Sequence, residues 1–251
     1  VAAERGHEVT LYEKSGSLGG LLKTTDYVSF KWPVKNYKDY LIRKIERSNV
    51  EVRLNKEATA KLVLDEGCDA AIIAIGSEPI VPPIPGAYGK NVISAVDVYG
   101  NEDKVAYNTV IVGGGEVGVE TGLHLAEKGR KVTILEMLDR LASEAAPLHY
   151  SLILLEAVEK QKNLKYILNA RCTNIHEKTV TYVDRNNLEH KIEADTIVIS
   201  VGMKPKTEET FKLTKELAEA GVKFYIVGDC AQTKGNIQKA IRSAYAAAAS
   251  I

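Results

Sequence analysis

Three glycines in one short stretch have the spacing of a phosphate-binding loop. The stretch is VIVGGGEVGVE, residues 110–120, and Gly113, Gly115 and Gly118 fit the pattern G-x-G-x-x-G. In such a loop the first glycine makes a tight turn and the second lets the backbone approach a pyrophosphate. The third lets the following helix pack closely on the strand. The spacing alone is a weak signal, because glycine-rich loops are common.

The flanking residues predict the elements that this chemistry needs. Residues 109–112 read as a buried strand before the loop, and Glu116 opens a predicted helix over 116–128. The N-terminus of that helix would face the phosphate charge. These features together predict dinucleotide binding, and the alternative is a structural turn in an ordinary α/β domain.

The next predicted strand, residues 131–136, ends in the acid Glu136. A carboxylate there accepts hydrogen bonds from both hydroxyls of an adenosine ribose and repels a 2′-phosphate. Met137 follows it, where an arginine would favour the phosphate. The sequence therefore favours NADH over NADPH.

The rest of the chain alternates strands and helices, which predicts mostly parallel sheets. The other predicted helices cover residues 33–48, 147–161, 206–220 and 237–250. The other predicted strands cover residues 8–13, 50–54, 69–75, 164–168, 172–176, 179–183, 189–192, 196–201 and 223–227, the middle ones forming an antiparallel meander. Residues 77–89 contain four prolines and read as a connection between domains.

A weak internal sequence similarity predicts a second nucleotide-binding unit. HEVTLYEK at residues 7–14 resembles RKVTILEM at 130–137, so Glu13 takes the place of Glu136. The first strand and glycine loop of that unit would lie before Val1, and we expect the chain to be a piece of a longer protein. The alternative is that Glu13 is only a solvated acid at a strand end.

Four segments together resemble the paired FAD- and NAD(P)-binding domains of flavin-dependent pyridine-nucleotide oxidoreductases. They are YEKSGSLGG (12–20), AIIAIGSEP (71–79), VIVGGGEVGVE (110–120) and YIVGDCAQTKGNIQKAI (225–241). The closer resemblance is to the C-terminal half of NADH:flavin oxidoreductases of the 2-enoate reductase, 2,4-dienoyl-CoA reductase and trimethylamine dehydrogenase type. It covers essentially the whole chain.

The resemblance implies an α/β fold with two Rossmann-like dinucleotide-binding domains of the three-layer ββα type. The first would be discontinuous and would lack its first strand. It would comprise an FAD-binding part at residues 1–95 and a second FAD-binding part at 206–251. The NAD(P)-binding domain would cover residues 96–205.

The resemblance also assigns cofactor-binding roles outside the glycine loop. Glu13 would bind the FAD ribose, Gly19 and Gly20 would pass close to the FAD, and Asp229 would accept a hydrogen bond from its ribityl chain. The remaining implied positions are Gly76 at a strand end, Gly228 beside the ribityl chain, Gly202 beside the nicotinamide, and Glu116 and Glu120 in the helix after the loop. Glu120 is either a contact near the nicotinamide or a helix-surface acid. Ile75 stands where the family often has threonine.

The implied activity is hydride transfer from NADH to FAD. In the parent protein, electrons would pass on through a 4Fe-4S cluster and FMN, held by an N-terminal barrel, to an unsaturated small-molecule substrate. Hydride transfer needs position more than acid–base chemistry, so we expect no dedicated catalytic residue. We also expect FAD to bind this chain weakly or not at all. A different class of function remains open: a non-redox domain that binds an adenine nucleotide or acts as a scaffold.

Composition argues against several other classes of function. The 251 residues carry a formal net charge of zero, and no apolar run approaches the roughly 20 residues that cross a bilayer. We expect a cytoplasmic protein with no nucleic-acid or membrane partner, and a homo-oligomer is possible. Three distant cysteines form no C-x-x-C pair, which argues against a disulfide reductase, and the five histidines have no metal-binding spacing.

Aromatic residues gather between residues 27 and 40, among several lysines. They are Tyr27, Phe30, Trp32, Tyr37 and Tyr40. Aromatic and basic residues together are found in nucleic-acid sites, but the neutral charge of the chain favours another role. We expect this segment to pack against the missing barrel or over the flavin.

Overall fold

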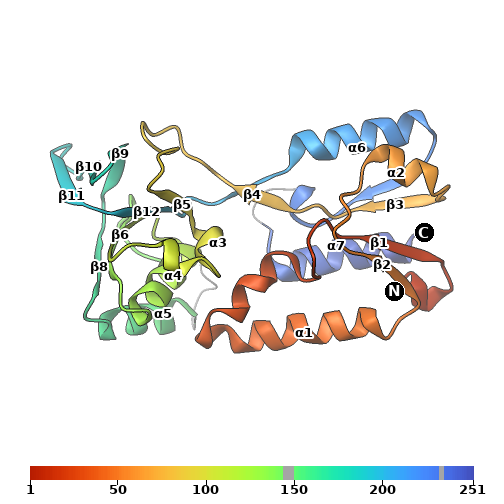
Figure 1. Cartoon of the computed structure of the whole chain (residues 1–251), viewed down its shortest axis with the longest axis horizontal. Coiled ribbons are helices and arrows are strands. Elements are labelled where there is room, and N and C mark those ends of the chain that lie inside the picture. Colours follow the sequence, from red (N-terminus) through yellow and green to blue (C-terminus); the bar gives the residue numbers. More distant parts are fainter. Residues whose placement is uncertain (144–149, 232–234) are drawn as a thin grey trace. The chain divides into compact units, whose positions relative to one another are not determined.

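The computed structural model describes residues 1–143, 150–231 and 235–251 (Figure 1). The chain forms two compact units. Unit 1 consists of Val1–Glu78 and Met203–Ile251, and unit 2 consists of Pro79–Gly202. The sequence placed residues 79–95 in the first domain, but they belong to unit 2, because strand β5 (Val92–Ser94) pairs there with β12 (Thr196–Ile199).

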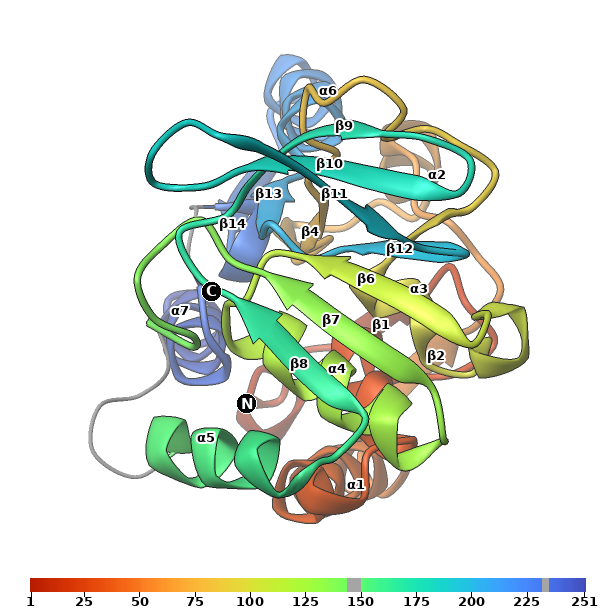
Figure 2. The same cartoon turned by 90° about the vertical axis from the view of Figure 1, so that its left-hand side faces the viewer.

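Unit 2 is built on a parallel sheet of five strands in the order β5-β12-β6-β7-β8 (Figure 2). The other three strands are β6 (Asn108–Val112), β7 (Lys131–Leu135) and β8 (Leu164–Ile167). The strand β6 lies in the middle of the sheet and pairs with β12 on one side and β7 on the other. The loop that leaves its carboxyl end therefore lies at the centre of the sheet edge.

The two faces of this sheet are covered by different layers (Figure 2). Helices α3 (Ala95–Val98), α4 (Glu116–Glu127) and α5 (Tyr150–Lys160) lie on one side. On the other side lies an antiparallel sheet of β9 (Arg171–Ile175), β10 (Thr179–Val183) and β11 (Glu189–Glu193). Val110 and Ile197 pack toward that second sheet with Cys172 and Val180 in one buried core. The three-layer α/β fold and the meander expected from the sequence are confirmed here.

Unit 1 contains two separate parallel pairs of strands. They are β1 (Val9–Tyr12) with β2 (Val50–Arg53), and β3 (Ala70–Ile73) with β14 (Lys223–Ile226). Among the described residues, β1 and β3 each have a strand partner on one side only. A further short pair, β4 (Ser77–Pro79) with β13 (Met203–Pro205), forms where the chain passes between the units.

Helices cover these pairs of strands. They are α1 (Trp32–Glu46), α2 (Ala60–Asp65), α6 (Thr207–Glu219) and α7 (Ile237–Ala249), with the short helices η1 (Ala3–Arg5), η2 (Gly20–Asp26), η3 (Ser29–Lys31), η4 (Glu102–Lys104, in unit 2) and η5 (Gly228–Cys230). Ala71, Ile73, Leu217 and Cys230 form the buried core beside β3, with side chains of α2 and α6 packed against it. The sequence missed α2, β4, β5 and α3, which are all short.

The predicted helix at 147–161 is confirmed over Tyr150–Lys160, and residues 147–149 lie outside the described part of the chain. The residues just before Gly6 form a single helical turn, η1. No helix in the described ranges combines the length and the apolar character needed to cross a membrane.

Candidate functional site

The glycine loop in unit 2 begins with a turn that only glycine fits. Gly113 has φ +105°, a backbone conformation that side chains disfavour. Its N–H donates to the carbonyl of Leu135 at 2.9 Å, and a Cβ added to it would lie 2.2 Å from the carbonyl oxygen of Ser200. The carboxyl ends of β6, β7 and β12 thus meet at this one residue.

The next two glycines of the pattern have opposite surroundings. A Cβ at Gly118 would lie 2.0 Å from the carbonyl oxygen of Gly113, so this glycine lets α4 pack directly against the loop. A Cβ at Gly115 would meet nothing within 4 Å. The space in front of Gly115, at the N-terminus of α4, is therefore open to a ligand, and the helix end there favours an anion.

Glu136 turns its carboxylate toward this loop. One oxygen accepts a hydrogen bond from the N–H of Gly114 at 2.6 Å, and the other from the N–H of Leu138 at 2.8 Å. The residue is 6% exposed. Each carboxylate oxygen has two lone pairs, so the group keeps acceptor sites for a ribose diol. The sequence placed Glu136 in the same candidate site as the loop, but it did not indicate the two backbone N–H donors that orient its carboxylate.

Gly202 lies just beyond the end of β12, two residues after the Ser200 carbonyl that touches Gly113. It is exposed and accepts a hydrogen bond from the N–H of Ile80 at 3.0 Å. Three of the predicted segments, the glycine loop, Glu136 and the end of β12, therefore lie together at one edge of the unit 2 sheet.

Glu120 is buried at 2% exposure, so it is not a helix-surface acid. Its carboxylate accepts a hydrogen bond from the hydroxyl of Tyr150 on α5. Burial and this carboxylate raise the pKa of Tyr150 far above its usual range, which keeps the hydroxyl protonated as a donor. Nothing in the sequence around Tyr150 indicates this pairing, because it joins helices 30 residues apart.

Glu13 in unit 1 repeats the local geometry of Glu136. Its carboxylate accepts from the N–H of Ser15, two residues on, at 2.7 Å, as Glu136 does from Leu138. Its own N–H donates to the carbonyl of Arg53, the last residue of β2, as the N–H of Glu136 donates to the carbonyl of Ile167, the last residue of β8. The internal similarity read from the sequence is therefore present in the backbone hydrogen bonds.

The chain contains a second internal sequence similarity, which was not noticed from the sequence alone. AIIAIGSEP, from residue 71, and IVISVGMKP, from residue 197, match at the strand, at the glycine and at the proline. They form β3 followed by Gly76 and β12 followed by Gly202. In unit 2 the strand β6 lies between β7 and β12. Its counterpart in unit 1 would lie between β1 and β3, each of which pairs with one strand only among the described residues.

The remaining residues predicted for unit 1 lie near the ends of its strands. Gly228 follows β14, and its N–H donates to the hydroxyl of Ser243 at 3.0 Å. Asp229 accepts a hydrogen bond from the hydroxyl of Ser77 at 3.4 Å, which joins the ends of β14 and β3. Asn236 caps α7 by accepting from the N–H of Lys239 at 2.9 Å.

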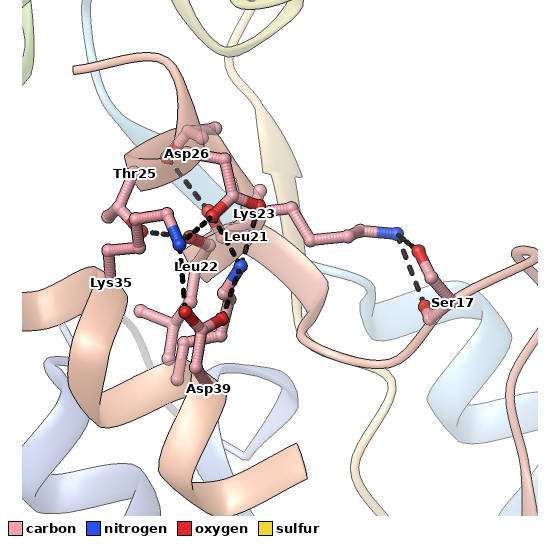
Figure 3. A network of polar contacts seen from close by, with 10 residues as sticks. Ser17, Leu21, Leu22, Lys23, Thr25, Asp26, Lys35 and Asp39 are labelled. Carbon is pink, nitrogen blue, oxygen red and sulfur yellow. Dashed lines mark hydrogen bonds and ion pairs between the residues drawn. The ribbon is translucent and has the colours of Figure 1, made fainter. Parts of the chain in front are cut away.

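Gly19 and Gly20 lie at the start of η2, beside a cluster of ion pairs centred on the buried Lys38. Lys38 of α1 contacts Asp26 at 2.5 Å and Asp39 at 3.1 Å, and its side chain is only 6% exposed. A Cβ at Gly19 would lie 3.2 Å from the Cδ of Lys38, so the lysine stem packs under this glycine. Figure 3 shows how Asp26, Asp39 and Lys35 converge in this cluster.

A second lysine holds the loop that precedes Gly19. Lys23 donates to the hydroxyl of Ser15 at 2.9 Å. It also donates to the carbonyl of Ser17 at 3.4 Å (Figure 3). The loop after Glu13 is therefore tied to η2 at several points. Sequence patterns did not indicate this lysine network, because its partners come from separate elements.

The cysteines offer no reactive thiol pair. Cys172 and Cys230 are buried and Cys68 is half-buried, and none forms a disulfide. Burial raises the pKa of Cys172 to about 11, which keeps it a thiol at neutral pH. In the described ranges, no group of three or more His, Cys, Asp or Glu side chains has the arrangement of a metal site.

Comparison with known proteins agrees with this geometry. The family described as pyridine nucleotide-disulphide oxidoreductase matches residues 1–250. The chain is 32% identical to a bilirubin reductase of Mediterraneibacter gnavus, over 99% of this chain and 38% of that protein. It is 35% identical to an NADH oxidase of Thermoanaerobacter brockii, over 97% of this chain and 37% of that protein.

A solved structure gives the same result. A 2-naphthoyl-CoA reductase in complex with 2-naphthoyl-CoA matches the whole chain with a TM-score of 0.91 and 29% identity, over 37% of that protein. The chain thus spans well under half the length of these relatives. The resemblance to flavin-dependent NADH oxidoreductases is confirmed, and the chain belongs to the pyridine nucleotide-disulphide oxidoreductase family.

Proposed function

We propose that unit 2 binds NADH, with the pyrophosphate at Gly115 and the adenosine ribose on Glu136. The observation that carries this proposal is the open space before Gly115 beside two glycines whose positions admit no side chain. Family members bind FAD and NAD(P)H, and the residues of this loop fit the pyrophosphate and ribose of such a dinucleotide. Gly202 and the end of β12 would border the nicotinamide, and Glu116 and Glu120 would support that side of the site.

In the longer protein, this unit would deliver NADH to FAD as part of an oxidoreductase. Bound NADH supplies a hydride, and bound FAD accepts it. The residues of this chain contribute position: the N-terminus of α4 fixes the phosphates, and Glu136 fixes the ribose. No side chain is assigned a proton-transfer role, and the thiols described above offer no dithiol acceptor.

Unit 1 fits FAD only in part. Glu13 supplies the strand-end acid, and Asp229, Gly228 and Gly76 lie near other strand ends, but the described residues of unit 1 contain no G-x-G-x-x-G loop. We propose that a strand with such a loop, from elsewhere in the longer protein, completes the sheet between β1 and β3.

The partner proposed for unit 1 is a flavin-carrying barrel of the same longer protein. Four aromatic side chains near η3 and α1 are exposed: Tyr27 at 48%, Trp32 at 62%, Tyr37 at 37% and Tyr40 at 48%. An exposed apolar patch of this kind marks an interaction surface. The further acceptors, FMN and a 4Fe-4S cluster, and an unsaturated small-molecule substrate belong to the same proposal.

Mixing the full-length protein with NADH under anaerobic conditions tests the redox role. Loss of the flavin absorbance band on a catalytic timescale is the expected result. Bound NADH with no loss of that band would instead favour a nucleotide-binding scaffold. Repeating the experiment with ADP in place of NADH is the control, because ADP binds the same loop and carries no hydride.

A further inference from the structure

A hydrogen-bonded pair of polar side chains joins helices α4 and α5 in unit 2. Tyr150, the first residue of α5, donates from its hydroxyl to the carboxylate of Glu120 on α4. Gly122, two residues after Glu120, faces the sheet, because a Cβ added there would lie 3.0 Å from the Cδ1 of Ile134 on β7. Successive residues of a helix are rotated by about 100°, so Glu120 points away from the sheet. It therefore takes no part in packing α4 onto the strands.

This pair lies beside the N-terminal half of α4. Glu116 and Glu120 are four residues apart and share one face of the helix. Burial raises the pKa of Tyr150 far above its usual range, and the carboxylates of Glu120 and Glu116 raise it further. The phenol therefore remains a hydrogen-bond donor at neutral pH. Glu120 is almost fully buried, and a buried carboxylate needs such a donor because water cannot replace it.

The proposed NADH site gives this carboxylate a ligand to contact. In that site the pyrophosphate lies at Gly115 and the adenosine ribose lies at Glu136, so the nicotinamide half extends from the pyrophosphate in the other direction. Glu120 is about 7.5 Å from Gly115 along the helix axis, at 1.5 Å per residue, and helix side chains lean toward the N-terminus. The nicotinamide carboxamide carries N–H donors, and an ionised carboxylate is purely an acceptor.

We propose that Tyr150 is a positioning residue for the nicotinamide end of the dinucleotide, which holds the Glu120 carboxylate in the orientation that accepts from the nicotinamide carboxamide. This inference rests on the proposed NADH site. Tyr150 acts through Glu120 and does not itself touch the cofactor. Its hydrogen bond uses one of the four lone pairs of the carboxylate. An acceptor that is already fixed loses less conformational freedom when the ligand binds, and this strengthens binding.

Calorimetric titration of the 251-residue chain with NADH and with ADP-ribose tests this role. ADP-ribose has the adenosine and the pyrophosphate but no nicotinamide, so it reports on the rest of the site and on folding. The variants are Tyr150→Phe, Glu120→Met and the double variant. The matched control is Tyr99→Phe, which removes a phenol hydroxyl that hydrogen-bonds to Thr121 of the same helix at 2.9 Å. It leaves the hydrogen bond from Tyr150 to Glu120 in place.

We expect the unaltered chain to bind NADH at least about tenfold more tightly than ADP-ribose. Tyr150→Phe should weaken NADH by about tenfold and leave ADP-ribose within about twofold. Glu120→Met should have the same effect. Adding Tyr150→Phe to Glu120→Met should weaken NADH by no more than about another twofold, because two residues that act through one contact are not additive. Tyr99→Phe should leave both ligands within about twofold.

Four results would overturn the inference. The first is NADH binding to the unaltered chain no more tightly than ADP-ribose. The second and third are an equal loss of both ligands in Tyr150→Phe, which would assign Tyr150 to the fold alone, and an unchanged NADH affinity in that variant. The fourth is a further tenfold loss of NADH when Tyr150→Phe is added to Glu120→Met. Binding of neither ligand to the unaltered chain would overturn the proposed function as well, whereas these four results leave the rest of the dinucleotide site in place.

Discussion

At the scale of single residues, the site in unit 2 depends on two glycines that face opposite ways. Gly118 has no room for a methyl group, whereas Gly115 has open space on the side of its missing side chain. The first residue therefore sets the packing of α4, and the second sets what can approach it. Substitutions at Gly118 should therefore change the stability of the loop, and substitutions at Gly115 should change its affinity for a ligand.

Gly118→Ala should destabilise unit 2, because the added carbon would lie 2.0 Å from a backbone oxygen. We expect a loss of about 2–4 kcal/mol in the free energy of unfolding, measured by urea denaturation with a fluorescence or circular-dichroism readout. Gly115→Ala is the matched control and should change that free energy by less than about 0.5 kcal/mol. Equal stability of the two variants would contradict the packing described for α4.

The ion pairs around Lys38 are a second residue-scale feature. Lys38→Met should lower the stability of unit 1 by about 1–3 kcal/mol, because two carboxylates then lose the partner that is buried between them. Lys35→Met is the control, since Lys35 contacts the same acids from an exposed position, and exposed pairs contribute little. Thermal unfolding of both variants measures the difference. A larger effect of Lys35→Met would refute this assignment.

The same cluster predicts a pH dependence. Burial works to lower the pKa of Lys38, but its hydrogen bonds to Asp26 and Asp39 outweigh this and raise it above the usual 10.5. Hydrogen bonds from Lys35 and Lys38 lower the pKa of Asp39 below the usual 3.8. The stabilisation is therefore lost as pH rises through the raised lysine pKa or falls through the lowered Asp39 pKa. Unfolding profiles should differ between Lys38→Met and the unaltered chain most strongly between these limits.

At the scale of elements, the two sheets differ in how completely their strands are paired. In unit 2 the strands β12, β6 and β7 each have partners on both sides, and β12 is buried along its whole length. In unit 1 the strands β1 and β3 have an open edge among the described residues. Open edges expose unpaired N–H and C=O groups and weaken a sheet.

Hydrogen exchange followed by mass spectrometry should report this difference in the 251-residue chain. Peptides covering β6, β7 and β12 should exchange more slowly than peptides covering β1, β2 and β3, because opening the paired core costs more free energy. The peptide covering β8, at the edge of the unit 2 sheet, is the internal control for edge position. Equal protection of β1 and β6 would contradict the open edge.

Sequence reasoning was most successful where a signal is local. The glycine loop, the strand-end acids and the period of the buried strands are each contained in a few consecutive residues. The alternation of strands and helices indicated an α/β fold, and the resemblance to flavin-dependent oxidoreductases implied the two Rossmann-like domains. The elements β5 and α3 were missed because each is only three or four residues long. Tyr150 was missed because the fold brings it to Glu120 from a distant helix.

At the scale of the whole molecule, the two units differ in which parts of a proposed dinucleotide site they contain. Unit 2 has the loop, the acid proposed for the ribose and the helix end in one place, whereas unit 1 has the acid Glu13 next to β1, which has an unpaired edge among the described residues. The chain also spans only 37–38% of its relatives. We therefore expect nucleotide binding by this chain to be limited to unit 2.

Titration of the purified chain with FAD checks that expectation. Because the described residues of unit 1 contain no G-x-G-x-x-G loop, the FAD pyrophosphate lacks the backbone donors of such a loop there, so we expect no tight complex and rapid loss of flavin on gel filtration. The same titration with NADH is the positive control for folded protein. A yellow, stoichiometric complex of micromolar or tighter affinity would show that unit 1 is complete as it stands.

The most direct test of the central claim is calorimetric titration of NADH into the chain and into Gly115→Val. The valine side chain would occupy the open space before the loop, in an extended backbone that accepts it (φ −64°, ψ −178°). The account predicts one NADH site in the unaltered chain, and a loss of affinity of at least about a hundredfold in the variant with its unfolding midpoint unchanged. Unaltered NADH affinity in a folded Gly115→Val chain would contradict it.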